Sequence, residues 1–86
     1  MEDTEIVFFA HIDLFLRRNG AFRGELRVGI IPWEGETRVH IREFFGPNRA
    51  TLSPGRKGVA IKVNQLREVI AGLQEAEKYL VRKGEL

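Results

Sequence analysis

Apolar and polar residues alternate along three stretches of the chain, and a helical spacing follows them. Residues 6–18, 23–33 and 38–45 show the two-residue period of strands that have one buried face. A fourth, shorter strand is expected over residues 56–62. Turn-forming residues separate the strands: Asn-Gly at 19–20, Glu-Gly-Glu at 34–36 and a loop rich in Gly and Pro over 46–55.

The alternation divides each predicted strand into two faces. The inward set is Ile6, Phe8, Ala10, Ile12, Leu14 and Leu16 in the first strand, Leu26, Val28 and Ile30 in the second, and Val39 and Ile41 in the third. Gly29 and Pro32 interrupt the second strand, and neither suits a regular central ladder. We therefore expect a bulge or strong curvature in that strand.

A helix is predicted after the fourth strand. Asn64 is a suitable N-cap, the helix ends near Arg82, and Gly84 suits the position that follows a helix end. Apolar residues recur between them at helical spacing: Leu66, Val69, Ile70, Leu73, Ala76 and Leu80. The fold class is therefore α+β, a curved four-stranded antiparallel sheet followed by one C-terminal helix. One helix covers one face of such a sheet and leaves the other open.

The open face combines aromatic and basic residues. It would carry Phe9, Phe15, Trp33 and Phe44, with Arg17, Arg27, Arg38 and Arg42 between them. Rings beside arginines form a platform on which unpaired bases stack while guanidinium groups hold phosphates. Alternatively, some of these rings, Phe9 and Phe15 above all, form the interface of a dimer.

The charges are distributed unevenly along the chain. The net charge is only +2. Residues 17–67, however, hold eleven basic residues against four acidic ones, and the ends are acidic. Ten of the fourteen basic residues are arginine, whose flat guanidinium pairs with phosphate and stacks on bases. This distribution favours a polyanionic ligand over an ordinary solvated surface.

The chain length favours one domain over residues 1–86, with residues 1–5 disordered. At 86 residues without cysteine, a single hydrophobic core is marginal, which favours a homodimer. The acidic start does not suit a secretory signal, and the apolar run after it is too short for a membrane span. We expect a cytoplasmic, nucleoid-associated protein that contacts no membrane.

Two segments resemble the signature of a known family. Residues 39–45 read Val-His-Ile-Arg-Glu-Phe-Phe, and residues 53–61 read Ser-Pro-Gly-Arg-Lys-Gly-Val-Ala-Ile. At this spacing, followed by a helix, they resemble the transcriptional coactivator positive cofactor 4 family, in its compact prokaryotic single-domain form. The resemblance covers residues 33–80, since Trp-Glu-Gly-Glu at 33–36 lies where the family has an aromatic-basic-glycine-basic turn.

The resemblance implies a dimer formed through the helices, with sheet grooves that bind single-stranded DNA. The implied binding residues are Trp33, Arg42, Phe45, Arg56 and Lys57, and the expected dimer contacts are Leu66, Val69, Ile70, Leu73 and Leu80. Alternation directs Phe44 outward and Phe45 inward, so both stay candidates beside Arg38, Arg27 and Arg17. Glu34, Glu36 and Ser53 replace basic residues of the family pattern, which weakens phosphate attraction locally.

We therefore expect a sequence-tolerant protein that binds single-stranded DNA in transcription, replication or repair and contacts the machinery of those processes. The alternatives are a protein-interaction module and a binder of single-stranded RNA. Catalysis is disfavoured, and no cofactor or metal is expected. His11, Asp13 and His40 are the only residues that resemble an acid–base or metal set, and no motif contains a nucleophile or carboxylate pair.

Overall fold

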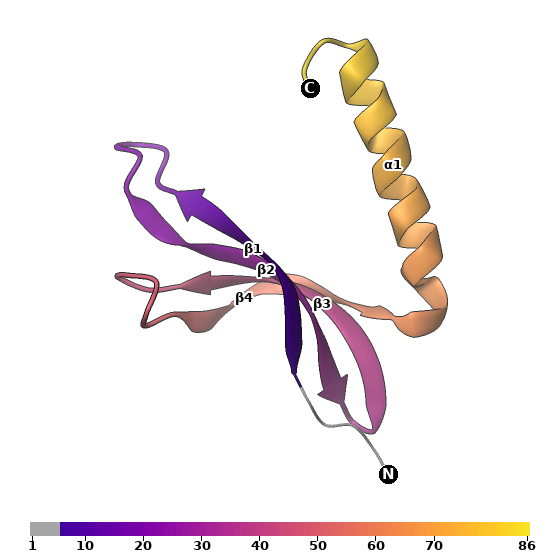
Figure 1. Ribbon diagram of the computed structural model, residues 1–86, viewed down its shortest axis with the longest axis horizontal. Coiled ribbons are helices and arrows are strands. Elements are labelled where there is room, and N and C mark those ends of the chain that lie inside the picture. Colours follow the sequence, from indigo (N-terminus) through magenta and orange to yellow (C-terminus); the bar gives the residue numbers. More distant parts are fainter. Residues whose placement is uncertain (1–5) are drawn as a thin grey trace.

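The computed structural model of the chain describes residues 6–86 (Figure 1). Its elements are β1 (Val7–Phe15), β2 (Phe22–Trp33), β3 (Glu36–Phe45), β4 (Ser53–Lys62), a 3-10 turn (Val63–Gln65) and α1 (Leu66–Arg82). The strands form one antiparallel sheet in the order β1-β2-β3-β4. The predicted fold class is confirmed. The prediction of disorder over residues 1–5 lies outside the described residues.

The first two turns lie where the sequence predicts them, whereas the third loop is shorter than predicted, because β4 begins at Ser53 and not near residue 56. Gly20 has φ +72° in the first hairpin loop, where the Asn19 side-chain oxygen accepts a hydrogen bond from the Ala21 N–H. Glu34 and Gly35 form a two-residue turn between β2 and β3, with φ values of 50° and 79°. Positive φ at both positions matches the twist of the flanking strands, so this hairpin is tight.

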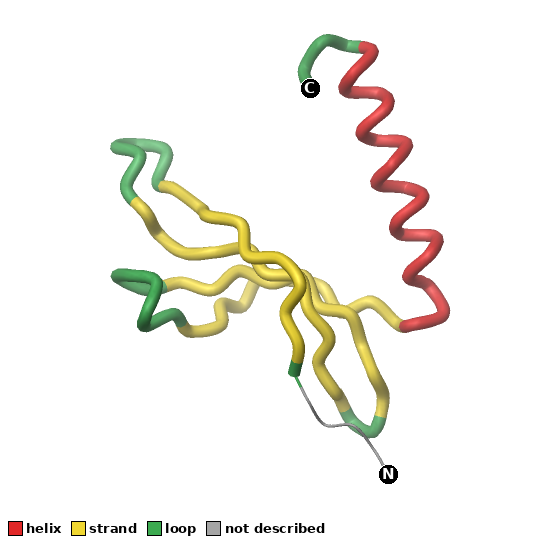
Figure 2. The backbone as a smooth tube through the Cα atoms, in the orientation of Figure 1, coloured by secondary structure: helices red, strands yellow, loops and turns green. Residues whose placement is uncertain are grey.

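Three irregularities in register change the sheet. Phe9 is an extra residue in β1, between the pairs Phe8–Gly29 and Ala10–Val28. A second extra residue lies in β2 opposite the end of β1, and residues 55–57 of β4 face a single residue of β3. Bulges of this kind bend a strand and increase its twist, and the strands bend strongly near their middle (Figure 2).

The bulge at Phe9 separates Phe8 from the apolar positions that follow it. Phe8 pairs with Gly29 and contacts Phe44, whereas Ile12 pairs with Leu26 on the opposite face. The prediction that Phe8 lies inward with Ile12 is therefore wrong, because one extra residue reverses the alternation. A Cβ on Gly29 would lie 2.6 Å from the Phe8 ring, so glycine makes room for that ring.

Cross-strand partners define the two faces of the sheet. We call one the arginine face; it carries Phe8, His11, Glu25, Arg27, Ile31, Trp33, Glu36, Arg38, His40, Arg42, Phe44 and Lys62. We call the other the aliphatic face; it carries Val7, Ile12, Leu26, Val28, Ile30, Val39, Ile41, Val59 and Ile61. Residues directly opposite in an antiparallel pair project from the same side, which fixes this assignment.

The helix begins and ends with different capping. Asn64 lies in the 3-10 turn, and Gln65 is the N-cap without a side-chain hydrogen bond, so the predicted Asn64 cap is wrong. At the other end, Gly84 has φ +79°. Its N–H donates to Val81 O, and the Glu85 N–H donates to Leu80 O. This pattern is a Schellman motif, which confirms Gly84 as the residue after the helix end.

The helix does not lie on the sheet. α1 projects away from the end of β4 and buries none of its residues (Figure 1). The prediction that it covers one sheet face is therefore wrong for a single chain, since the short turn after β4 directs it outward. The radius of gyration is 15.3 Å, against about 12 Å for a compact domain of this length. Among residues 6–86, no helix is long and apolar enough to cross a membrane.

Candidate nucleic-acid interface

The arginine face contains a shallow hollow of about 380 Å³. Its lining residues come from β1 to β4 and the segment before β1: Ile6, Phe8, Ile31, Trp33, His40, Arg42, Phe44 and Pro54. Trp33, the last residue of β2, is 49% exposed, so its indole is open to a flat ligand. Arg42 donates a hydrogen bond from Nη1 to Gly55 O at 3.0 Å, which fixes its guanidinium beside the hollow.

Below the exposed residues lies a buried layer centred on Phe44, which is only 8% exposed. The Phe8 ring meets it edge-on with centroids 5.7 Å apart. The Arg27 guanidinium lies 4.2 Å from the Phe44 centroid and 5.1 Å from that of Phe8. Such cation–π contacts strengthen when they are shielded from water. Phe44 and Arg27 therefore support the face, while Trp33 is its accessible ring.

A buried carboxylate holds Arg27 in this position. One oxygen of Glu25 accepts a hydrogen bond from Arg27 Nε at 2.9 Å and lies 3.1 Å from His11 Nδ1. The hydrogen bonds from Arg27 and then His11 lower the pKa of Glu25 below its usual 4.5. Because the carboxylate stays charged, Arg27 is largely neutralised and has little capacity left for a phosphate.

His40 lies at the base of the hollow, between Arg38 and Arg42 along β3. It is 5% exposed, and neither ring nitrogen has a hydrogen-bond partner among the described residues. Burial lowers the pKa of His40 below 6.5, and the positive charges of Arg42 and Arg38 lower it further. The imidazole is therefore neutral at physiological pH. Its strand partners, Gly29 and Ala60, are small enough to leave room for the ring.

The segment Pro54–Gly58 forms the bulge of β4, in which residues 55–57 face Glu43. Gly55 and Gly58 are needed there because a Cβ would lie 2.6 Å from the Phe45 ring at the first and 2.7 Å from Ile41 O at the second. Arg56 and Lys57 are exposed, and neither has an ion-pair partner within residues 6–86. The two glycines therefore let β4 lie close to the Phe45 ring and to the β3 backbone, and the two basic residues remain available to a ligand.

The structure brings together only part of the predicted site. Trp33, Arg38, Arg42, Phe44 and Arg27 share the arginine face. Phe45 lies on the aliphatic face, as the alternation predicted. The Arg23 guanidinium lies over the Phe45 ring, 5.1 Å from the ring centroid. Lys57 lines a smaller hollow on that face, beside Leu26 and Ile41, and Arg17 lies in the first hairpin loop.

Other predicted residues do not line the hollow. Phe9 and Phe15 are exposed, one in the β1 bulge and the other at the end of that strand. His11, Asp13 and His40 do not assemble, and no group of three or more potential metal ligands occurs within residues 6–86. Asp13 instead pairs with Arg49 from the loop between β3 and β4.

Sequence reasoning failed to predict three residues of this face: Phe8 and Lys62, and also Ile6, which lines the hollow although the alternation directed it inward. Phe8 was assigned to the core because nothing in the sequence of β1 indicates that Phe9 is an extra residue. Lys62 lies on β4 directly opposite Arg38, on the arginine face. Counting alternate positions from Gly58 along β4 would have placed it there, because Gly58 and Lys62 are four residues apart.

Comparison with known proteins shows which family the chain resembles. Residues 22–72 match the family described as Transcriptional Coactivator p15 (PC4). The chain is also 35% identical over 54 residues to the RNA polymerase II transcriptional coactivator KIWI of Arabidopsis thaliana, across 63% of this chain. That match spans 50% of the Arabidopsis protein, so the chain corresponds to about half of it. No solved structure gives a significant match.

The matched region contains β2, β3, the β4 bulge and the first part of α1, so it includes most of the strands that carry the arginine face. It therefore covers more than half of the chain and includes the motifs at 39–45 and 53–61. The chain belongs to the transcriptional coactivator p15 (PC4) family.

Proposed function

We propose that this chain binds single-stranded DNA on the arginine face, with little dependence on base sequence. The observation that carries the proposal is Trp33, a half-exposed indole at a hollow that also holds Arg42, with Arg38 on the same face. An indole stacks on any base, and the arginines pair with phosphates. The described residues that line this face come from the strands and the segment before β1, so the face itself presents no helix to the major groove of duplex DNA.

We further propose that the working form is a homodimer. Leu73 on α1 is 59% exposed, and Ile12 and Val59 on the aliphatic face are also exposed in the single chain. A second copy can cover both surfaces with the same apolar chemistry, as a two-fold interface requires. The extended shape of the isolated chain fits this arrangement, because a compact monomer of this size would be smaller.

The binding proposal is tested by fluorescence anisotropy of a labelled single strand of about 20 nucleotides and of its duplex, at low and physiological salt. We expect a preference for the single strand that weakens with salt, and quenching of Trp33, the only tryptophan in the chain. Equal binding to the duplex, or none, would overturn the proposal and favour a protein partner. An RNA strand of the same sequence, measured in parallel, tests whether the sugar matters.

The family suggests a general role in the cell for this chain. Family membership favours action in transcription, and a sequence-tolerant single-strand binder would also suit replication or repair. Binding to a transcription bubble compared with a nicked or gapped duplex separates these roles. A preference confined to the bubble would support transcription, and equal affinity for gapped DNA would support the wider role.

A further inference from the structure

The far end of the arginine face carries a pair of basic residues on neighbouring strands. Arg38 on β3 and Lys62 on the edge strand β4 are direct cross-strand partners. Side chains in such a pair start about 5 Å apart, and like charges placed there repel each other. Lys62 is exposed and has no ion-pair partner in the described part of the chain. An anion between the two side chains would relieve the repulsion.

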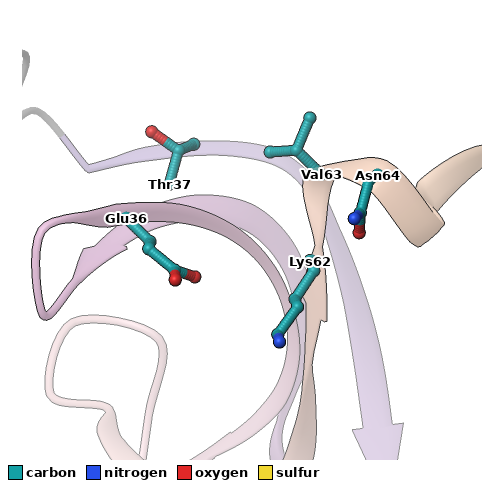
Figure 3. A pocket seen from close by; sticks show the side chains of 5 residues that line it. All are labelled: Glu36, Thr37, Lys62, Val63 and Asn64. Carbon is teal, nitrogen blue, oxygen red and sulfur yellow. The ribbon is translucent and has the colours of Figure 1, made fainter.

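One carboxylate already lies at this position. Glu36 Oε1 is 3.4 Å from Arg38 Nε, and the Glu36 side chain is 56% exposed. Figure 3 shows the side chains of Glu36 and Lys62 directed to the same side of their strands, opposite to those of Thr37 and Val63; all four residues line a hollow of about 450 Å³. A charge-assisted hydrogen bond of full strength is about 2.7–2.9 Å long, so the contact is loose and exchangeable.

The hollow adjoins the ring that the proposed function requires. Glu36 is the cross-strand partner of Trp33, across the tight turn between β2 and β3. A base stacked on Trp33 would therefore place a neighbouring phosphate close to Arg38 and Lys62. In that position the phosphate and the Glu36 carboxylate would compete for one guanidinium.

We propose that Arg38 and Lys62 form a phosphate subsite for the nucleotide stacked on Trp33, and that Glu36 competes with the phosphate for it. The inference rests on the proposed function, which it deepens by assigning one phosphate contact and its internal competitor. Glu36 then reduces affinity at low salt. It also keeps one phosphate contact from forming fully, which makes binding less dependent on salt.

The test compares Glu36→Gln with Glu34→Gln in the anisotropy assay with the 20-nucleotide strand. Glu34 is a matched control, because it lies on the same turn and carries the same charge but makes no ion pair in the described chain. We expect Glu36→Gln to tighten binding about fivefold at low salt, as for one unit charge removed near a phosphate in water. The slope of log affinity against log salt should steepen by up to about 0.7.

Lys62→Gln should weaken binding and flatten the slope by about 0.7. In the double variant the gain from Glu36→Gln should be smaller than in the parent. Equal gains from Glu34→Gln and Glu36→Gln, or an unchanged slope in Lys62→Gln, would overturn the subsite while leaving single-strand binding intact. If the parent and Glu36→Gln both fail to bind the strand, the proposed function and the subsite fall together. Binding by Glu36→Gln alone would support Glu36 as the competitor.

Discussion

The two faces of the sheet differ in how well the side chains of a single chain shield them from solvent. On the arginine face, Phe44, His40 and Glu25 are buried although no helix covers them, because the bent strands and long side chains cover one another. On the aliphatic face, Ile12 and Val59 stay exposed, and α1 stands apart from them. On the aliphatic face Ile61 is also buried, but most of the other branched side chains stay half-buried or exposed and need another surface to cover them.

Because of this difference, the two faces suit different partners. The hydrogen bond to Gly55 O holds the Arg42 guanidinium in place before any ligand arrives, so that less side-chain freedom is lost on binding. The aliphatic face offers apolar area without directed polar groups. The helix stripe, which is the apolar side of α1, does the same; it consists of Leu66, Val69, Ile70, Leu73 and Leu80. The arginine face therefore suits a charged, flat ligand, and the aliphatic face suits an apolar surface such as a second copy.

Loss of the Phe44 ring should have the largest effect. Phe44→Ala removes a ring that is 8% exposed and contacts both Phe8 and Arg27. We expect the free energy of unfolding to fall by about 3–5 kcal/mol, which chemical denaturation would measure. A stable variant that has lost only DNA affinity would show that Phe44 is a contact residue and not support.

A charge on the helix stripe should be the next largest effect. Leu73→Glu should dissociate the dimer, at a cost of about 2–4 kcal/mol in association free energy, as measured by sedimentation equilibrium. Ala71→Glu is the matched control, because it adds the same charge on the opposite side of the helix. If the unmodified protein is a monomer, or both variants behave alike, the apolar side of α1 is not a dimer surface.

Removing the exposed indole should affect binding without affecting the fold. Trp33→Ala should weaken single-strand binding by about 1–3 kcal/mol through lost stacking, with little change in the salt slope. Because Trp33 is half exposed, the melting temperature should change far less than in Phe44→Ala. Unfolding of the Trp33 variant would place this ring in the core instead.

The bulge in β4 tests whether binding extends beyond the arginine face. If Arg56 and Lys57 each neutralise one phosphate, their alanine variants should each flatten the salt slope by about 0.7. Lys57 lines the hollow on the aliphatic side, so its variant is the sharper test. An unchanged slope in Lys57→Ala would exclude the hollow on the aliphatic face from the phosphate path.

The smallest effect concerns pH. The pKa of His40 is lowered in the folded chain, so just below pH 6.5 the unfolded chain binds a proton that the folded chain does not. Stability should therefore decrease as the pH falls through this range. His40→Leu should remove that decrease in pH-dependent denaturation.

A second acid-induced loss should remain in His40→Leu. It begins below pH 4.5, because Glu25 has a lowered pKa and its stabilising charge is lost on protonation. If the His40→Leu variant keeps the full pH dependence above that range, another group is responsible.

The sequence determined the order of elements, the turns and most of the strand faces. Periodicity and turn chemistry act over a few residues, so Gly20, Gly35 and Gly84 occupy the positions that the local pattern requires. The same alternation correctly separated Phe44 from Phe45. These features need no knowledge of distant contacts.

Only the tertiary structure decided which residues support the arginine face and where the helix lies. The extra residue at Phe9 moves Phe8 onto Phe44, and that choice depends on how the ring packs over Gly29 of the neighbouring strand. The position of Arg27 depends on the rings of Phe8 in β1 and Phe44 in β3, which its guanidinium contacts, and on Glu25 beside it. The outward direction of α1 could not be predicted from the sequence either, because an amphipathic helix has the same pattern whether it covers its own sheet or another chain.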